Sequence, residues 1–75
     1  MKTTRKNEIS PIVIEVGKKI KDIILEKKMR QRDVAHDAGL DVENLRKYIK
    51  GTQEMKISTM LRIVEALEIN VEELF

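Results

Sequence analysis

From residue 11 to residue 75 the apolar residues recur at steps of three and four, the spacing of one face of an α-helix. The stripes predict helices over 11–28, 31–38, 42–50 and 57–68, with a last helical turn over 71–75. No segment shows the alternation that is typical of a β-strand. The sequence therefore predicts an all-α, compact five-helix domain over residues 11–75.

The same stripes predict which side chains face the core. In the first helix we expect Ile12, Val13, Val16, Ile20, Ile23 and Ile24 to point inward. In the second helix the expected inward residues are Val34, Ala35 and Ala38. In the fourth they are Ile57, Met60, Leu61, Val64 and Leu67.

Two helix starts carry sequence signals. Ser10 precedes Pro11, so a capping hydroxyl would be followed by proline at the first helical position. Asn70 and Glu73 have the spacing of a capping box, which predicts the last turn.

The segment 31–51 has the spacing of a helix-turn-helix, in which two short helices cross steeply. Counted from Gln31, this motif needs apolar residues at positions four, ten, fifteen and eighteen, alanine at five and glycine at nine. The chain supplies Val34, Ala35, Gly39, Leu40, Leu45 and Tyr48 at these positions. Asp41 is expected to cap the second of the two helices, and Gly51 to end it. The alternative is a corner of two helices without a role in DNA binding.

Composition excludes several classes of protein. The chain has 75 residues, no cysteine and one histidine, so we expect neither disulfides nor a metal site. Aromatic residues make up 3%, which is too few for a platform that stacks single-stranded bases. No catalytic constellation occurs, so we expect no enzyme and no cofactor. No apolar run approaches a membrane span, and the basic start lacks the apolar stretch of a signal peptide, which predicts a cytoplasmic protein.

Charge is distributed unevenly along the chain. Residues 1–32 hold ten Lys and Arg against four Asp and Glu, whereas residues 33–75 hold five against nine. A basic front half suits a polyanionic partner. Residues 1–10 are expected to form a flexible basic arm, which either follows DNA through Lys2, Arg5 and Lys6 or is simply solvated.

Residues 14–75 resemble the Xre family of phage-repressor and Cro-type DNA-binding domains. The resemblance rests on the segment from Gln31 to Gly51 and on the ending ISTMLRIVEALEINVEELF. It implies a five-helix domain that forms a homodimer and binds a double-stranded, palindromic operator through the major groove. It also implies a transcriptional regulator, and repression is the expected direction.

The resemblance implies roles for individual residues. Gln31 matches a residue whose side chain and backbone N–H contact a phosphate, and Val42, Glu43 and Lys47 match positions that reach base edges. Lys50 and the loop up to Lys56 match the segment along the DNA backbone.

Three positions depart from the family pattern. Arg30 replaces a capping Ser or Thr but can contact phosphate directly, Ile49 replaces a glutamate, and Met55 replaces a loop proline.

The helical wheel of residues 42–50 gives an independent view of this surface. Val42, Glu43, Arg46, Lys47 and Lys50 lie within an arc of roughly 140°. Lys47 and Arg46 are the stronger candidates for guanine or phosphate contacts. Glu43 either accepts a hydrogen bond from cytosine or only pairs with Arg46 or Lys47, and the sequence leaves both open.

A second function class remains open at this stage. The chain could instead be an antitoxin-like or adaptor protein that uses the fold mainly for protein–protein interaction. For the homodimer, the candidate surface is the C-terminal turn with Leu74 and Phe75, together with exposed parts of the first helix.

Overall fold

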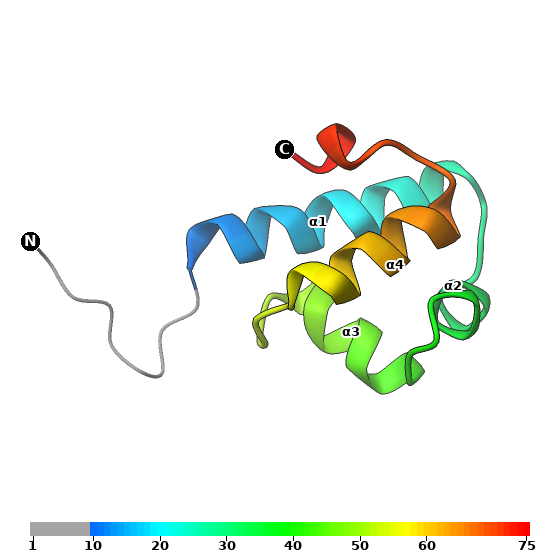
Figure 1. Ribbon diagram of the computed structural model, residues 1–75, viewed down its shortest axis with the longest axis horizontal. Helices are drawn as coiled ribbons and strands as arrows, with labels where there is room; N and C mark the ends of the chain where they lie inside the picture. The colour runs from blue at the N-terminus through cyan, green and yellow to red at the C-terminus, as the bar shows by residue number, and fades with distance from the viewer. Residues whose placement is uncertain (1–9) are drawn as a thin grey trace, which may run out of the picture.

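The computed structural model describes residues 10–75. Their helices are α1 (Pro11–Glu26), α2 (Gln31–Asp37), α3 (Val42–Lys50), α4 (Ile57–Leu67) and the 3₁₀-helix η1 (Val71–Leu74) (Figure 1). The expected all-α class is confirmed. The expected count of five α-helices is wrong, because the last element is a single 3₁₀ turn and four α-helices remain among the described residues. The predicted arm lies outside the described residues, except for Ser10.

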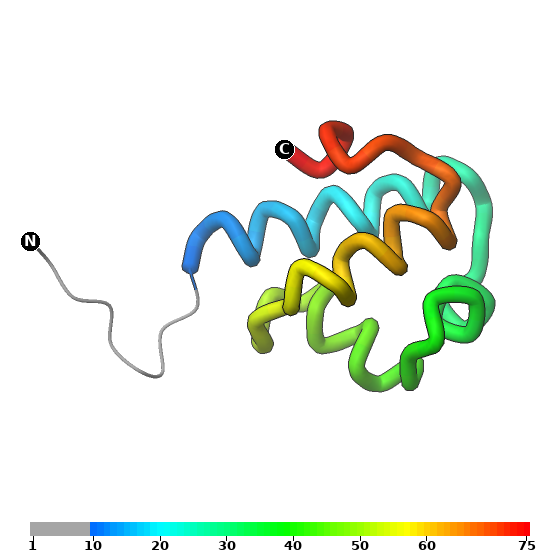
Figure 2. Tube along the Cα trace, in the orientation of Figure 1, coloured from blue at the N-terminus to red at the C-terminus, as the bar shows by residue number. Residues whose placement is uncertain are grey.

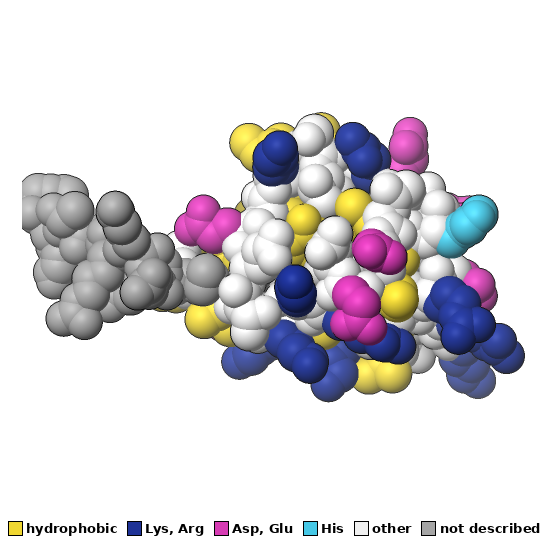
Figure 3. All heavy atoms as spheres, turned by 90° about the horizontal axis from the view of Figure 1, so that it is seen from below, with side chains coloured by type: hydrophobic (Ala, Val, Ile, Leu, Met, Phe, Trp, Pro, Cys, Tyr) yellow, Lys and Arg dark blue, Asp and Glu magenta, His cyan; other side chains and the backbone are white. Residues whose placement is uncertain are grey.

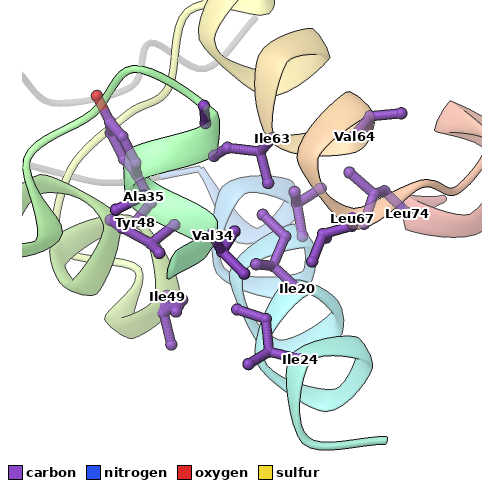
Figure 4. Packing of buried hydrophobic residues seen from close by; sticks show 13 residues of the cluster. Ile20, Ile24, Val34, Ala35, Tyr48, Ile49, Ile63, Val64, Leu67 and Leu74 are labelled. Atoms are coloured by element: carbon purple, nitrogen blue, oxygen red, sulfur yellow. The ribbon is translucent and has the colours of Figure 1, made fainter. Parts of the chain in front are cut away.

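The helices enclose one core. α1 packs mainly against α3, and α2 lies against both α3 and α4. After α4 the chain turns back, so that η1 lies beside α1 (Figure 2). Residues from all five elements form the buried cluster, and the side chains labelled in Figure 4 lie around a common centre. The largest fully buried side chains are Ile20, Val34, Leu45, Ile63, Leu67 and Leu74. No helix within residues 10–75 is long and apolar enough to span a membrane.

All four α-helices end in the same kind of turn, in which one residue adopts a left-handed conformation. Gly39 and Gly51 take this position after α2 and α3, as expected, with φ of 71° and 74°. Lys28 and Glu68 take it after α1 and α4, both with φ of 58°. The helices predicted over 11–28 and 57–68 therefore end earlier, at Glu26 and Leu67.

The helices begin where the sequence predicts, but not all of the expected side-chain capping hydrogen bonds are present. Ser10 and Asp41 occupy the N-cap positions of α1 and α3, yet neither side chain bonds to its helix. The expected capping bonds are therefore wrong, and Asp41 acts on the helix only through its charge near the positive end of the helix dipole. At η1 the expected contact is present, because the Asn70 N–H donates to Glu73 Oε2 at 3.0 Å.

The predicted inward face of α4 is partly wrong. Ile57 and Leu61 are exposed, at 72% and 50%, whereas Thr59 and Ile63 are buried in their place. α4 carries apolar side chains around most of its circumference, so its spacing alone does not select one face. In α1, Ile12 is likewise exposed rather than inward. Ile12 and Ile57 share one surface of the molecule, which is described below.

Candidate nucleic-acid interface

The turn between α2 and α3 has the hydrogen bonds of a Schellman motif, which fixes the angle between the helices. The Leu40 N–H donates to the carbonyl oxygen of Ala35 at 2.7 Å, and the Gly39 N–H donates to that of His36 at 3.1 Å. In Figure 1, α2 is seen nearly along its axis while α3 runs across the view. The turn therefore holds α3 at a steep angle to α2.

The residues required by the helix-turn-helix spacing pack below this turn. Val34, Ala35 and Leu45 are fully buried, Tyr48 is almost so, and Leu40 packs partly against them. The expected helix-turn-helix is therefore present with a packed core. The outer side of α3 faces solvent.

The candidate DNA-binding residues lie on this outer side and on the segments that flank it. Seven are exposed or half-buried with polar side chains: Arg30, Gln31, Glu43, Arg46, Lys47, Lys50 and Lys56. Val42, the eighth, is half-buried and packs partly against the core. Figure 3 looks at the molecule from below Figure 1, and Lys and Arg side chains project from much of this face with some acidic side chains among them. Five of the eight residues are cationic and one is anionic, so the set attracts phosphate.

Arg46 joins the two helices of the motif. Its Nη1 lies 3.3 Å from Glu43 Oε2, one turn earlier on α3. Its Nε donates to Gln31 Oε1, on the first residue of α2, at 3.4 Å. The sequence predicted the Glu43 pairing as one of two alternatives. The contact with Gln31 was not predicted, because residues 15 positions apart meet only through the angle between the helices.

The three departures from the family pattern have clear places in the structure. Arg30 is the exposed N-cap of α2 and makes no side-chain cap bond. Ile49, which replaces the family glutamate, is buried and faces the core. Met55 is half-buried against the core and anchors the loop before α4 by apolar contact.

A model of the Cro/C1-type helix-turn-helix DNA-binding domain matches residues 19–75. The chain belongs to this family. The match includes α2, α3 and the turn between them, and it confirms the resemblance inferred from the sequence. This Cro/C1-type domain is a DNA-binding transcription regulator.

Solved structures of regulators have the same fold as this Cro/C1-type domain. The wild-type restriction-modification controller protein C.Esp1396I is 30% identical, with a TM-score of 0.77 over 81% of this chain and 79% of that chain. The controller protein C.AhdI from Aeromonas hydrophila is 24% identical, with a TM-score of 0.81 over 84% of this chain and 96% of that one. The clp gene regulator ClgR from Corynebacterium glutamicum is 15% identical, with a TM-score of 0.83 over 89% and 71% of the two chains. No curated protein matches the chain by sequence.

Proposed function

We propose that the protein is a homodimeric, sequence-specific regulator that reads the major groove of double-stranded DNA with α3 and represses transcription at palindromic operators. The observation that carries this proposal is the division of α3 into two sides. Leu45, Tyr48 and Ile49 are buried in the core, while Glu43, Arg46, Lys47 and Lys50 are exposed. A helix of nine residues with one polar, mainly cationic side fits the major groove of B-form DNA.

In this proposal the residues have two kinds of role. Val42, Arg46 and Lys47 face base edges, where Arg and Lys donate to guanine and an apolar group meets the thymine methyl. Phosphates are contacted by Lys50 at the end of α3 and by three residues outside this helix, Arg30, Gln31 and Lys56. These contacts fix the position of the helix in the groove. The similar solved structures include a restriction-modification controller protein and a clp gene regulator, so the proposal rests on this surface and not on their targets.

Two copies are proposed because one short helix reads few base pairs. A two-fold-related pair of half-sites doubles the contacts and sets their spacing. We propose that the copies associate through a surface at the start of α1 and α4 and at the C-terminus, which we call the apolar hollow. It is a depression of about 220 Å³ lined by Ile12, Val13, Val16, Met55, Ile57, Met60 and Phe75. Leu74 was expected on this surface but is buried at 1%, because η1 turns it against the core.

Repression is the direction of regulation that we expect when the dimer occupies a promoter. A dimer bound over a promoter excludes other proteins from the same stretch of major groove. Repression of this kind needs no second functional surface on the protein. A transcription assay with a promoter that carries the selected site measures it.

Selection of bound sites from a random DNA pool tests the proposal most directly. We expect a palindromic consensus, and affinity for it should fall steeply as salt concentration rises, because phosphate contacts release counterions. A consensus without two-fold symmetry would contradict the homodimer. Undetectable binding to duplex DNA at low salt would overturn the reader function and favour the antitoxin-like or adaptor alternative, in which the apolar hollow binds another protein.

A further inference from the structure

Arg62 of α4 lies against the turn of the helix-turn-helix. Apart from the chain neighbours of Gly39, a Cβ at this glycine would meet one heavy atom of residues 10–75 within 4 Å, and that atom is Arg62 Nη1 at 3.9 Å. Arg62 is exposed, whereas the next residue, Ile63, is fully buried and anchors α4 in the core. The packing of α4 against α2 thus brings a cation to the turn that leads into α3.

The guanidinium of Arg62 is not used by the part of the chain that the structure describes. Among residues 10–75 the one ion pair joins Glu43 and Arg46, and the side chain of Arg62 takes part in no hydrogen bond there. A guanidinium carries several N–H donors and keeps its charge in proteins. Arg62 can therefore donate to an anion outside the chain without giving up a contact.

The turn beside Arg62 has no other strong cation. Residues 33–45 contain no Lys or Arg, and the carboxylates of Asp37 and Asp41 on either side of the turn are exposed. The cations assigned to DNA so far lie before α2, along the middle and end of α3, and before α4. Without Arg62, the start of the reading helix would present mainly negative charge to the phosphates.

The position of the turn places Arg62 near the DNA backbone. B-form DNA carries phosphates along both edges of the major groove, which is about 12 Å wide, so a helix in the groove has phosphates beside both of its ends. Gly39 precedes Val42, the first residue of α3, by three positions, and their Cα atoms are therefore at most about 11 Å apart. The guanidinium beside Gly39 is thus close to the end of α3 that lies between these edges.

We propose that Arg62 is a further phosphate-binding residue, which holds the start of α3 in the major groove as Lys50 and Lys56 hold its end. Arg62 binds the DNA backbone and reads no base, so it adds to affinity and fixes the position of the helix without selecting a sequence. Its charge also offsets the repulsion between the phosphates and the carboxylates of the turn. The inference rests on the proposed function of α3 as the helix that enters the groove.

The first test compares Arg62→Ala with Lys18→Ala, which removes the same charge from an exposed position on α1. We expect Arg62→Ala to weaken binding to the selected operator and to a random duplex by the same factor, about three- to fivefold for each bound copy at low salt. The slope of log K against log salt should fall by about 1 for each copy, because one phosphate contact is lost. Arg62→Lys keeps the charge and should restore the slope, and Lys18→Ala should leave it unchanged.

The second test locates the contact on the DNA. Single phosphates of the operator are replaced by neutral methylphosphonates, and each duplex is titrated with the wild-type protein and with Arg62→Ala. Beside the start of α3, the replacement should weaken binding of the wild type and leave that of Arg62→Ala unchanged, because the variant already lacks this contact. At the phosphates of Lys50 and Lys56, the replacement should weaken binding of both proteins alike.

Two results would overturn the inference. The first is an effect of Arg62→Ala on affinity and salt slope that is no greater than the effect of Lys18→Ala. The second is a lower free energy of unfolding together with an unchanged salt slope, since Arg62 would then only support the turn. In both cases the wild-type protein still binds its operator, so the reader function stands. Failure of the wild type to bind any duplex would refute the reader function and, with it, the role of Arg62.

Discussion

Gly17 lies so close to the end of α3 that its Cα faces the backbone carbonyl of Tyr48 directly. A Cβ at Gly17 would overlap the Tyr48 carbonyl oxygen and would lie 2.9 Å from that of Ile49. The atoms in the way belong to the backbone of α3 and not to a flexible side chain, so they cannot move aside singly. This contact fixes how closely α1 approaches the C-terminal end of the reading helix.

The first prediction follows from this contact. Gly17→Ala should lower the free energy of unfolding by about 1–3 kcal/mol, because α1 and α3 must separate to accept the methyl group. Urea denaturation followed by circular dichroism measures the change. Lys21→Ala, at an exposed position on the same helix, is the control and should change stability by less than about 0.5 kcal/mol. A Gly17→Ala protein as stable as the wild type would show that the helices are not in close contact.

The second prediction concerns the helix ends without glycine. Lys28 and Glu68 have φ of 58°, a conformation that costs residues with a Cβ about 1 kcal/mol. Lys28→Gly and Glu68→Gly should each raise the free energy of unfolding by about 0.5–1 kcal/mol, since part of the gain is lost to greater freedom of the unfolded chain. Thermal denaturation of both variants checks this. Lys27→Gly is the matched control, because Lys27 has φ of −83° and should only lose stability on this change.

The third prediction tests the reading side of α3. Arg46→Ala combined with Lys47→Ala should abolish operator binding and leave the fold intact, because both side chains are exposed. Binding to random duplex should persist, because the phosphate contacts assigned to the other cationic residues remain. Lys18→Ala with Lys21→Ala removes the same charge from exposed positions on α1 and serves as control. Operator binding that survives in the α3 variant would place the interface elsewhere.

The fourth prediction tests the apolar hollow as the surface for self-association. Ile57→Glu places a charge on a residue that is 72% exposed, so folding should be unaffected while the dimer weakens. Light scattering should report monomers at concentrations where the wild type is dimeric, and affinity for the full palindrome should fall toward that for a half-site. Leu25→Glu is the matched control: Leu25 is 64% exposed near the other end of α1, about 20 Å from Ile12 along the helix. The same loss of dimer in both variants would argue against the hollow.

The sequence predicted α3 better than the rest of the chain. α3 has its expected bounds. Gly39 ends the preceding helix and Gly51 ends α3, and both glycines adopt the left-handed conformation. α1 and α4 end at Glu26 and Leu67, and the left-handed residues that follow them, Lys28 and Glu68, carry no such signal. The residues that follow them, Met29 and Ile69, pack against the core.

The surface features that depend on the angles between helices could not be predicted. The contact of Gln31 with Arg46 requires the crossing of α2 and α3, and no local spacing encodes it. The exposure of Ile57 depends on which side of α4 meets the core, and the wide spread of apolar side chains around this helix leaves that open. The Glu43–Arg46 pair, in contrast, was one of the expected alternatives, because partners three residues apart meet in any helix.

The apolar hollow and the reading helix share a stretch of α1. Val16 lines the hollow, and its neighbour Gly17 rests on the carbonyl of Tyr48 in α3. A second copy bound in the hollow would restrict this part of α1, and the tight backbone contact would pass that restriction to α3. Association and operator binding should therefore favour each other by the same factor, as reciprocal coupling requires. The protein would then respond to its own concentration more sharply than a monomeric regulator does.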